Sequence, residues 1–310
     1  MLNNHQFNNL LGLILDQYIV FGPVIQNGQV IFDQVLKASE IKLSEKTIMP
    51  FKNVLYPNGI NKNLINDKKI ALIGLHSCDL AALDIFYQQF SSINLLPDRK
   101  NVLVIASECK PDDDCFCDVF GANKPDNFDL FLQKNGTDYE IFSGSYVGTS
   151  YLDKLGLKKQ VKQIEIKKID IKTDNIKAKK LTDLIENRIL NKDFWQGIAN
   201  NCFGCGACTT VCPLCFCIRQ NYQNDLNGNQ SECLTWDSCF ADDFFKISGN
   251  FDFKPKNVDR LYNWYHHKFV RATRELNKPL CVGCGRCIKA CPANLNIKNI
   301  LASIEEKNDG

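Results

Sequence analysis

Hydrophobic residues in the first half of the chain follow the spacing of alternating helices and strands. Residues 5–17 carry apolar side chains at helical spacing, which predicts an amphipathic helix. Two continuously apolar runs follow, at 70–75 and 101–106, and such runs are typical of strands buried on both faces of a parallel sheet. The segment 79–90 between them predicts a helix, so we expect a right-handed βαβ unit here.

Local turn signals refine these predictions. Ser77 or Asp79 is available to cap the start of the helix between the two apolar runs. Asn-Gly pairs at 27–28 and 135–136 each separate two apolar-rich runs. Because both residues of such a pair readily adopt a positive φ, each pair predicts a tight β-hairpin.

The pattern changes in the second half of the chain. Residues 158–180 are dense in lysine and include an alternating, half-exposed strand pattern, and a helix is predicted near 180–191. The lysine run is either a solvated face or a docking surface for an acidic partner. Cysteine and aromatic residues dominate beyond it. We therefore predict an N-terminal α/β domain at 1–155, a linker and helix at 156–194, and a cysteine-rich domain at 195–310.

Composition narrows the class of protein. The 37 basic and 35 acidic residues leave a formal net charge of +2, which argues against a general nucleic-acid binder. The N-terminus lacks the features of a signal peptide, and no apolar run is long enough to span a bilayer. The sixteen cysteines are therefore expected in a reducing cytoplasm, where thiols are available as metal ligands.

One cysteine motif occurs twice. The pattern Cys-x2-Cys-x2-Cys-x3-Cys-Pro begins at Cys202 and again at Cys281, and it is the pattern of bacterial two-cluster ferredoxins. The alternative, structural zinc, rarely places three ligands within seven residues before a Cys-Pro. The fourth cysteine of each copy points to the other cluster. The predicted ligands of the first 4Fe–4S cluster are Cys202, Cys205, Cys208 and Cys291, and those of the second are Cys281, Cys284, Cys287 and Cys212.

A second group of cysteines lies in the N-terminal domain. Cys78 and Cys109 each follow one of the two buried strands, so both thiols are expected at the carboxyl edge of the sheet. Cys115 and Cys117 lie on the next loop, which can fold back to the same edge. These four thiols predict a third 4Fe–4S cluster. Two alternatives stay open: buried, unreactive thiols, or a Cys78 nucleophile with His76 as its base.

Four cysteines remain in the insertion that separates the two motifs. They are Cys215, Cys217, Cys233 and Cys239. Four thiols are sufficient for a further cluster, but packing beside the predicted clusters is the simpler interpretation. The segment 257–276 predicts a helix that either packs over the clusters or presents a basic face to a partner. Arg286 lies inside the second motif, where Ala207 lies inside the first, and this charge is expected to give the second cluster the higher potential.

With these motifs, the chain resembles the beta subunit of cytoplasmic sulfhydrogenases and the electron-transfer subunit of anaerobic sulfite reductase. The likeness covers nearly the whole chain and includes features that a generic ferredoxin lacks. The matching segments are TIMPFKNVLYP (47–57), GLHSCDLAALDIF (74–86), EC followed by CFC (108–117), FDLFL (128–132), CFGCGACTTVCPLCFC (202–217), TWDSCF (235–240) and LCVGCGRCIKACPANL (280–295).

This resemblance implies an α+β protein in which a partly parallel sheet precedes a two-cluster ferredoxin-like domain with a long insertion. It also implies a role in electron transfer within an oxidoreductase complex, without a substrate site on this chain. The expected partners are a catalytic subunit of the nickel–iron hydrogenase or the sulfite reductase type, together with a flavin- and NAD(P)H-binding subunit.

Other features of the sequence agree with an electron-transfer role. The chain has no GxGxxG after a strand, no GxxxxGK[ST] and only four histidines, so a standard nucleotide or flavin site is not expected on it. An enzyme acting alone through Cys78 and a nucleic-acid-binding protein with a structural cluster are the two alternatives.

Overall fold

The chain divides into two compact units. The computed structural model describes residues 2–43, 45–56, 69–90, 96–157, 178–187, 192–224 and 230–306. Unit 1 comprises Met1–Asp112 and Ala122–Ile169, and unit 2 comprises Asp113–Gly121 and Asp170–Gly310. The predicted boundaries at 155 and 195 stay predictions, and the lysine-rich strand pattern falls outside the described residues.

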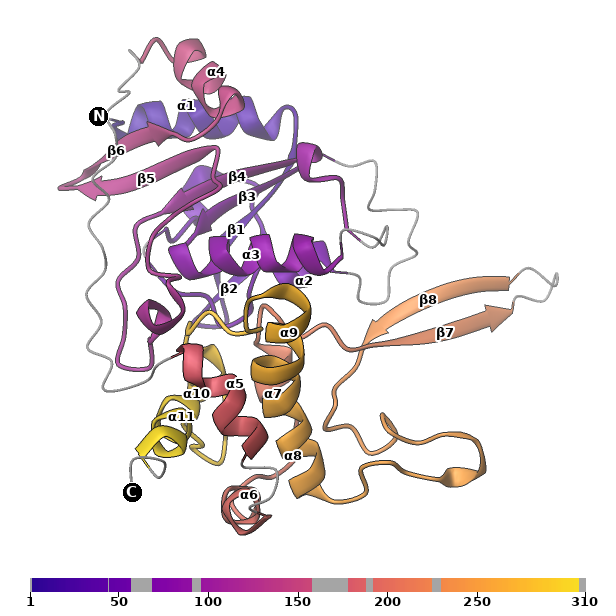
Figure 1. The fold of residues 1–310 in the computed structure, drawn as a ribbon. Helices are drawn as coiled ribbons and strands as arrows, with labels where there is room; N and C mark the ends of the chain where they lie inside the picture. The colour runs from indigo at the N-terminus through magenta and orange to yellow at the C-terminus, as the bar shows by residue number, and fades with distance from the viewer. Residues whose placement is uncertain are drawn as a thin grey trace. The chain divides into compact units, whose positions relative to one another are not determined.

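Unit 1 is built on a six-stranded mixed sheet (Figure 1). The order of its strands is β2-β1-β3-β4-β5-β6. The inner four are parallel, and the hairpin partners at the two edges are antiparallel. The strands are β1 (Ile19–Gln26), β2 (Gln29–Gln34), β3 (Ile70–Leu75), β4 (Val102–Ser107), β5 (Leu130–Asn135) and β6 (Asp138–Ser143). The partly parallel sheet predicted from the sequence is therefore confirmed.

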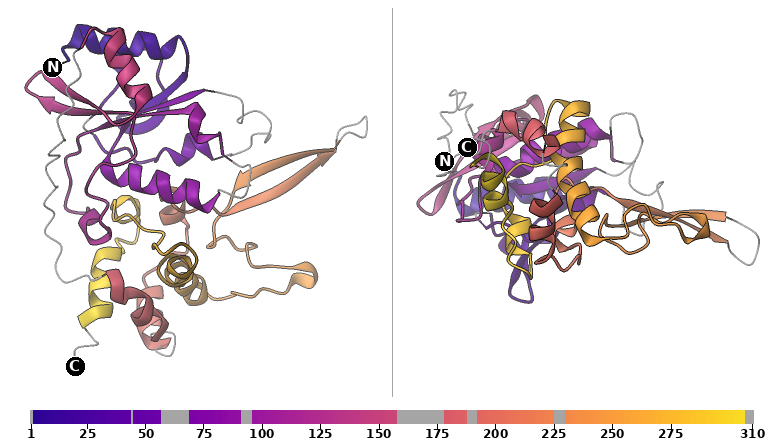
Figure 2. Two further views of the ribbon diagram at one scale, coloured as in Figure 1. Left: turned by 45° about the horizontal axis from the view of Figure 1, so that its top comes forward. Right: turned by 60° about the horizontal axis from the view of Figure 1, so that its bottom comes forward.

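Helices cover both faces of this sheet (Figure 2). Helices α1 (Asn4–Leu15) and α4 (Tyr146–Lys154) bury their apolar side chains against one face, in a core that all six strands contribute to or border. Helices α2 (Lys52–Leu55) and α3 (Ser77–Gln89) lie on the other face. Since both faces are covered, every residue of β3 and β4 is buried, which accounts for their continuously apolar sequences.

Both predicted hairpins and the βαβ unit are present in unit 1. Asn27 and Gly28 have φ values of 49° and 76°, as the tight turn between β1 and β2 requires. The predicted helix cap is wrong, because α3 begins one residue earlier and His76 occupies the N-cap position. Asp79 instead lies in the first turn, where its carboxylate accepts the backbone N–H of His76 at 3.3 Å.

Unit 2 contains short helices around the two cysteine motifs and one two-stranded sheet. Its helices are α5 (Ala178–Asn187), α6 (Lys192–Ala199), α7 (Ala207–Thr210), α8 (Asn257–His266), α9 (Ala272–Leu276), α10 (Arg286–Lys289) and α11 (Ile297–Glu306). A π-helical segment, η7 (His267–Arg271), joins α8 to α9, so the helix predicted at 257–276 is continuous. These helices enclose an aromatic-rich core that includes Trp195, Trp264 and Tyr265.

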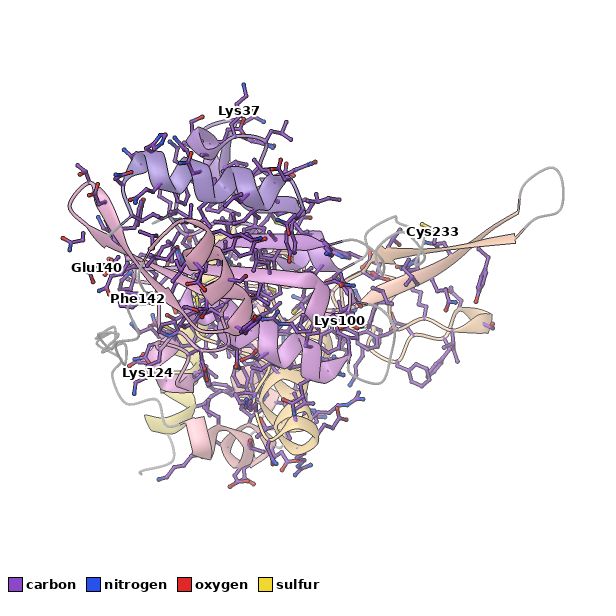
Figure 3. All side chains as sticks on the ribbon, turned by 90° about the horizontal axis from the view of Figure 1, so that it is seen from above. Lys37, Lys100, Lys124, Glu140, Phe142 and Cys233 are labelled. Atoms are coloured by element: carbon purple, nitrogen blue, oxygen red, sulfur yellow. The ribbon has the colours of Figure 1, made fainter. Side chains whose placement is uncertain are left out.

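The insertion between the motifs contains the antiparallel strands β7 (Ile218–Asn224) and β8 (Gln230–Trp236). This hairpin projects away from the helices of unit 2 (Figures 1 and 2). Cys233 lies on β8 and is labelled on the projecting ribbon in Figure 3. None of the helices described in either unit is long and apolar enough to cross a membrane.

Candidate metal centre

The two cysteine motifs form loops with the same backbone conformation. Gly204 and Gly206 of the first loop have φ values of 66° and 75°, and Gly283 and Gly285 of the second have 63° and 74°. Side chains are disfavoured in this left-handed region, so glycine allows each loop to turn tightly and direct three thiols inward. Each loop is followed by one turn of helix, α7 or α10.

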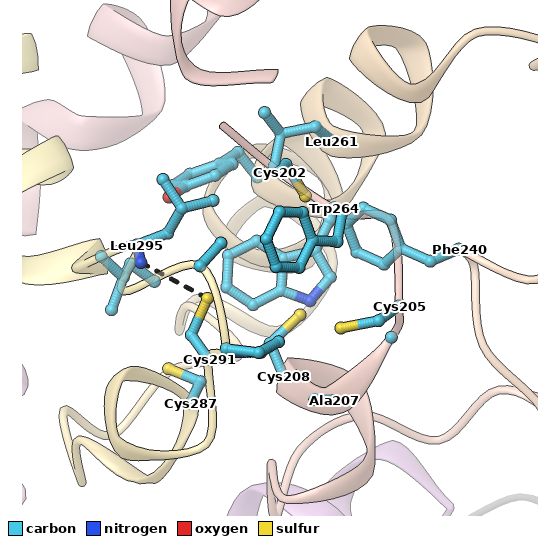
Figure 4. A pocket seen from close by; sticks show the side chains of 16 residues that line it. Cys202, Cys205, Ala207, Cys208, Phe240, Leu261, Trp264, Cys287, Cys291 and Leu295 are labelled. Atoms are coloured by element: carbon cyan, nitrogen blue, oxygen red, sulfur yellow. Dashed lines mark hydrogen bonds between the residues drawn. The ribbon is translucent and has the colours of Figure 1, made fainter. Parts of the chain in front are cut away.

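A first cavity lies inside the first loop. Its cysteine lining combines three thiols of the first motif with the last thiol of the second motif (Figure 4). Leu261, Trp264 and Tyr265 of α8 form part of its wall. The cavity volume is about 50 Å³, whereas one water needs roughly 10–15 Å³. Its cysteines are Cys202, Cys205, Cys208, Cys291 and also Cys287.

A second cavity lies inside the second loop and has the complementary composition. Its volume is about 20 Å³, and its cysteines are Cys212, Cys281, Cys284 and Cys287. The last thiol of the first motif therefore faces the second loop, as the crossed ligation of the sequence prediction requires. Cys287, Trp264 and Ile297 line both cavities, so the two sites share a wall.

Backbone N–H groups lie close to the thiols in both loops. The N–H of Gly204 donates to the Cys202 sulfur at 3.4 Å, and the Gly283 N–H makes the equivalent bond to Cys281. Leu214 donates to Cys212, again at 3.4 Å. Such bonds stabilise negative charge on sulfur, which suits thiolate ligands of a cluster.

Burial makes these thiols poor thiolates in the absence of a cation. Desolvation raises the pKa of Cys208 to about 12; Lys268 opposes the shift and the neighbouring thiols add to it. The pKa of Cys281 rises to about 12, again chiefly through burial. Burial also raises the pKa of Cys287 well above its usual value. Iron in the cavities would supply the positive charge that deprotonated sulfur needs here.

Two further observations test whether a cluster fits. The indole Nε1 of Trp264 is buried and has no hydrogen-bond partner among the described residues, although it lines both cavities. A cluster sulfur would accept this N–H. In the described ranges, no group of three or more His, Cys, Asp and Glu side chains could hold a single metal ion. Zinc would draw its thiolates to about 2.3 Å, so the wider spacing fits a larger group.

Two elements of this site were missed in the sequence. Residues 113–121 belong to unit 2, and Phe116 in this segment donates its N–H to the Gly283 carbonyl at 2.8 Å and lines the second cavity. Lys268 lines the same cavity from η7. No local pattern marks either feature, because each depends on contacts between segments far apart in the chain. Arg286 is buried but does not line either cavity.

The four cysteines predicted to hold a third cluster are divided between the two units. Cys78 lies in the first turn of α3 and Cys109 lies just beyond β4, both in unit 1, whereas Cys115 and Cys117 are in unit 2. The third cluster stays a prediction. His76, the base of the alternative interpretation, bonds through its Nε2 to the Leu43 carbonyl at 3.2 Å.

The remaining four cysteines do not form one group. Cys215, Cys217 and Cys239 belong to the core of unit 2, and Cys239 is a hydrogen-bond partner of Cys217. Cys233 lies on the hairpin, outside this core (Figure 3). None of the sixteen cysteines, all of which lie in the described ranges, forms a disulfide.

Comparison with known proteins agrees with this geometry. Residues 201–295 match the family model of the 4Fe-4S dicluster domain. The chain is also 29% identical over 317 residues to sulfhydrogenase 2 subunit beta of Pyrococcus furiosus, which covers 93% of this chain and 92% of that protein. No solved structure matches the chain. The resemblance predicted from the motifs is confirmed, as is the α+β fold with a C-terminal dicluster domain.

Proposed function

We propose that this chain is the iron–sulfur electron-transfer subunit of a sulfhydrogenase-type complex. It relays electrons between a nickel–iron hydrogenase module and a flavin- and NAD(P)H-binding subunit. The observation that carries this proposal is the pair of cysteine-lined cavities with a common wall at Cys287 and Trp264. Two one-electron centres that share a wall allow an electron to pass between them without a substrate pocket.

The proposed ligand sets follow the cavity linings. Each set takes three thiols from one motif and the last thiol from the other motif. When bound, a 4Fe–4S cluster accepts and releases one electron at a time. The protein holds the thiolates, orients backbone N–H groups toward sulfur and excludes water. The first set is Cys202, Cys205, Cys208 and Cys291, and the second is Cys281, Cys284, Cys287 and Cys212.

The two loops differ in their access to solvent, which supports a direction for partner contact. Cys205 is exposed, and Phe203 beside it is 72% exposed. Cys284, the equivalent of Cys205, is buried, and Phe116 of the chain's own segment 113–121 packs on its loop. We therefore assign electron exchange with a partner protein to the first loop, where an apolar side chain stands beside the ligand nearest to solvent.

The relative from Pyrococcus furiosus is named as a subunit of a sulfhydrogenase, and this supports an oxidoreductase complex as the setting. The test is anaerobic purification of the tagged, full-length chain from its native host. We expect a flavin-containing partner and a nickel-containing partner to copurify with it. A haem-containing partner would instead indicate the sulfite reductase type. Recovery of the chain alone, or without iron, would contradict the proposal.

A surface variant makes the same experiment specific to the first loop. Phe203→Asp places a charge on the exposed apolar position and leaves the cysteines unchanged. Tyr146→Asp changes an aromatic residue of unit 1 that is 89% exposed and serves as the matched control. We expect a redox partner to be lost from the F203D preparation and retained with Y146D. Equal retention by both variants would refute the assignment of the first loop.

A further inference from the structure

Lys268 is a buried ammonium group in the wall of the second cavity. Only 3% of this residue is exposed, and it belongs to the π-helical segment η7. No carboxylate of the described residues forms an ion pair with it. A buried charge is costly unless a charge of opposite sign compensates it. The groups around Lys268 should therefore identify the anion that it serves.

The contacts of Lys268 point to sulfur. Its Nζ donates to the sulfur of Cys212 at 3.2 Å and to the carbonyl of Leu280 at 3.0 Å. The same atom lies 5.1 Å from the ring centroid of Trp264, in a cation–π contact. Trp264 precedes Lys268 by four residues, so the continuous helix presents both side chains on one face.

The electrostatic surroundings agree with this arrangement. Burial by itself lowers the pKa of a lysine, yet the pKa of Lys268 is raised well above its usual value by the thiols of Cys212, Cys215 and Cys281. The ammonium therefore stays charged although it is buried. The anions that compensate it are the sulfur atoms of the second proposed ligand set.

The first cavity lacks such a charge. No lysine, arginine, aspartate or glutamate is among its described lining residues. Cys291, the counterpart of Cys212, accepts a neutral N–H from the backbone of Leu295 at 3.4 Å. The two motifs are alike in spacing and in loop conformation, so Lys268 is a clear electrostatic difference between the two sites.

We infer that Lys268 is the counter-ion of the second cluster and gives it the higher reduction potential of the pair. This rests on the proposed function, because it presupposes that the second ligand set holds a cluster. Reduction adds one electron and no proton to a group that is already negative. A fixed positive charge at hydrogen-bond distance from a ligand sulfur, in a medium of low dielectric, favours the reduced form. Lys268 is thus a positioning residue for the electron.

The test is a redox titration of the anaerobically purified, full-length chain, monitored by electron paramagnetic resonance. Lys268→Met removes the charge and keeps the length of the side chain. We expect the ratio of reduced to oxidised second cluster, at a fixed ambient potential, to fall by roughly tenfold, which is about 59 mV for a one-electron couple. The first cluster should shift less. Cys205→Ser and Cys284→Ser backgrounds identify which signal belongs to which cluster.

Three variants separate charge from other effects. Lys268→Gln retains a hydrogen-bond donor without the charge, so it should shift in the same direction as K268M, and it decides the matter if K268M fails to bind iron. Lys289→Met removes an exposed lysine near the second motif and should change neither potential, because solvent screens that charge. Arg286→Ala tests the competing source of positive charge inside the motif.

The outcomes distinguish this inference from the proposed function. Absence of two cluster signals in the unmodified chain would refute the proposed function. Two signals whose potentials are unchanged in K268M and K268Q would refute only the role of Lys268. A shift in R286A without one in K268M would transfer that role to Arg286. A wild-type potential in K268Q with a shift in K268M would show that hydrogen bonding, rather than charge, is responsible.

Discussion

At the scale of single residues, the two cysteine loops have the same conformation and different neighbours. Gly204 and Gly283 occupy equivalent positions with φ values of 66° and 63°. A Cβ at Gly283 would overlap the backbone carbonyl of Phe116. A Cβ at Gly204 would lie 3.0 Å from the side-chain oxygen of Asn257, which has room to rotate. The second loop is therefore fixed by the backbone of another segment, and the first is not.

This difference predicts unequal effects of the same substitution. Both Gly204→Ala and Gly283→Ala incur the left-handed backbone cost of about 1–2 kcal/mol. Only G283A also displaces the segment that donates the Phe116 N–H to Gly283, a bond with a net contribution of about 1 kcal/mol. We expect G283A to lose its iron at a lower urea concentration than G204A, as followed by the visible absorbance of the clusters. Equal midpoints would contradict the packing of residues 113–121 on this loop.

At the scale of elements, Arg260 of α8 anchors the loop that follows Cys239. Its guanidinium donates to the carbonyls of Phe240 and Lys254 at 3.2 and 2.8 Å. It also pairs with Asp252 at 3.1 Å, and both side chains are largely buried. One side chain of the helix thus holds both ends of a loop that has little other regular structure.

Removal of this side chain should release the loop and destabilise unit 2. Arg260→Met leaves Asp252 buried without its partner, and loss of one member of a buried ion pair costs about 3–5 kcal/mol. We expect faster proteolytic cleavage between residues 241 and 256 and a lower urea midpoint.

The control for this prediction is an exposed arginine close to the same helix. Arg271→Met removes the exposed pair with Glu275, in which the side chains are 65% and 50% exposed. Exposed pairs contribute about 0–1 kcal/mol, so this variant should resemble the unmodified protein. Similar proteolysis of both variants would show that Arg260 does not hold the loop.

At the scale of the whole molecule, the number of clusters is the main quantity to measure. The dicluster domain accounts for roughly eight irons and eight labile sulfides per chain, and a third cubane would raise each count to about twelve. We predict a count near twelve from the four remaining cysteines at Cys78, Cys109, Cys115 and Cys117. Iron and sulfide analysis of the anaerobically purified chain is the measurement. A count near eight would refute the third cluster.

Substitution of the same cysteines provides an independent check on that count. In a Cys109→Ser variant, the iron content should fall by about one third if a third cubane is present. Cys233→Ser is the control, because Cys233 lies on the projecting hairpin β7–β8. Equal iron contents for both variants would indicate that Cys109 is not a ligand.

Much of the fold follows from short-range patterns. The buried strands β3 and β4 are evident from continuously apolar runs, since a strand covered on both faces has no polar side to reveal a period of two. The hairpins follow from Asn-Gly pairs, because few other residues tolerate a positive φ at both turn positions. The helix cap was misplaced by one residue, since several polar side chains at 76–79 are able to cap and only the backbone conformation selects one.

The sequence by itself determined the cysteine motifs, their crossed pattern and the alternation of strands and helices, because these features depend on neighbours within a few residues. Only the tertiary structure decided which segment covers the second loop and where a buried charge lies. Lys268 is 56 residues from Cys212, and Phe116 lies in a segment separate from the rest of unit 2. Contacts over such separations arise from packing of the whole unit, and no local periodicity or turn residue records them.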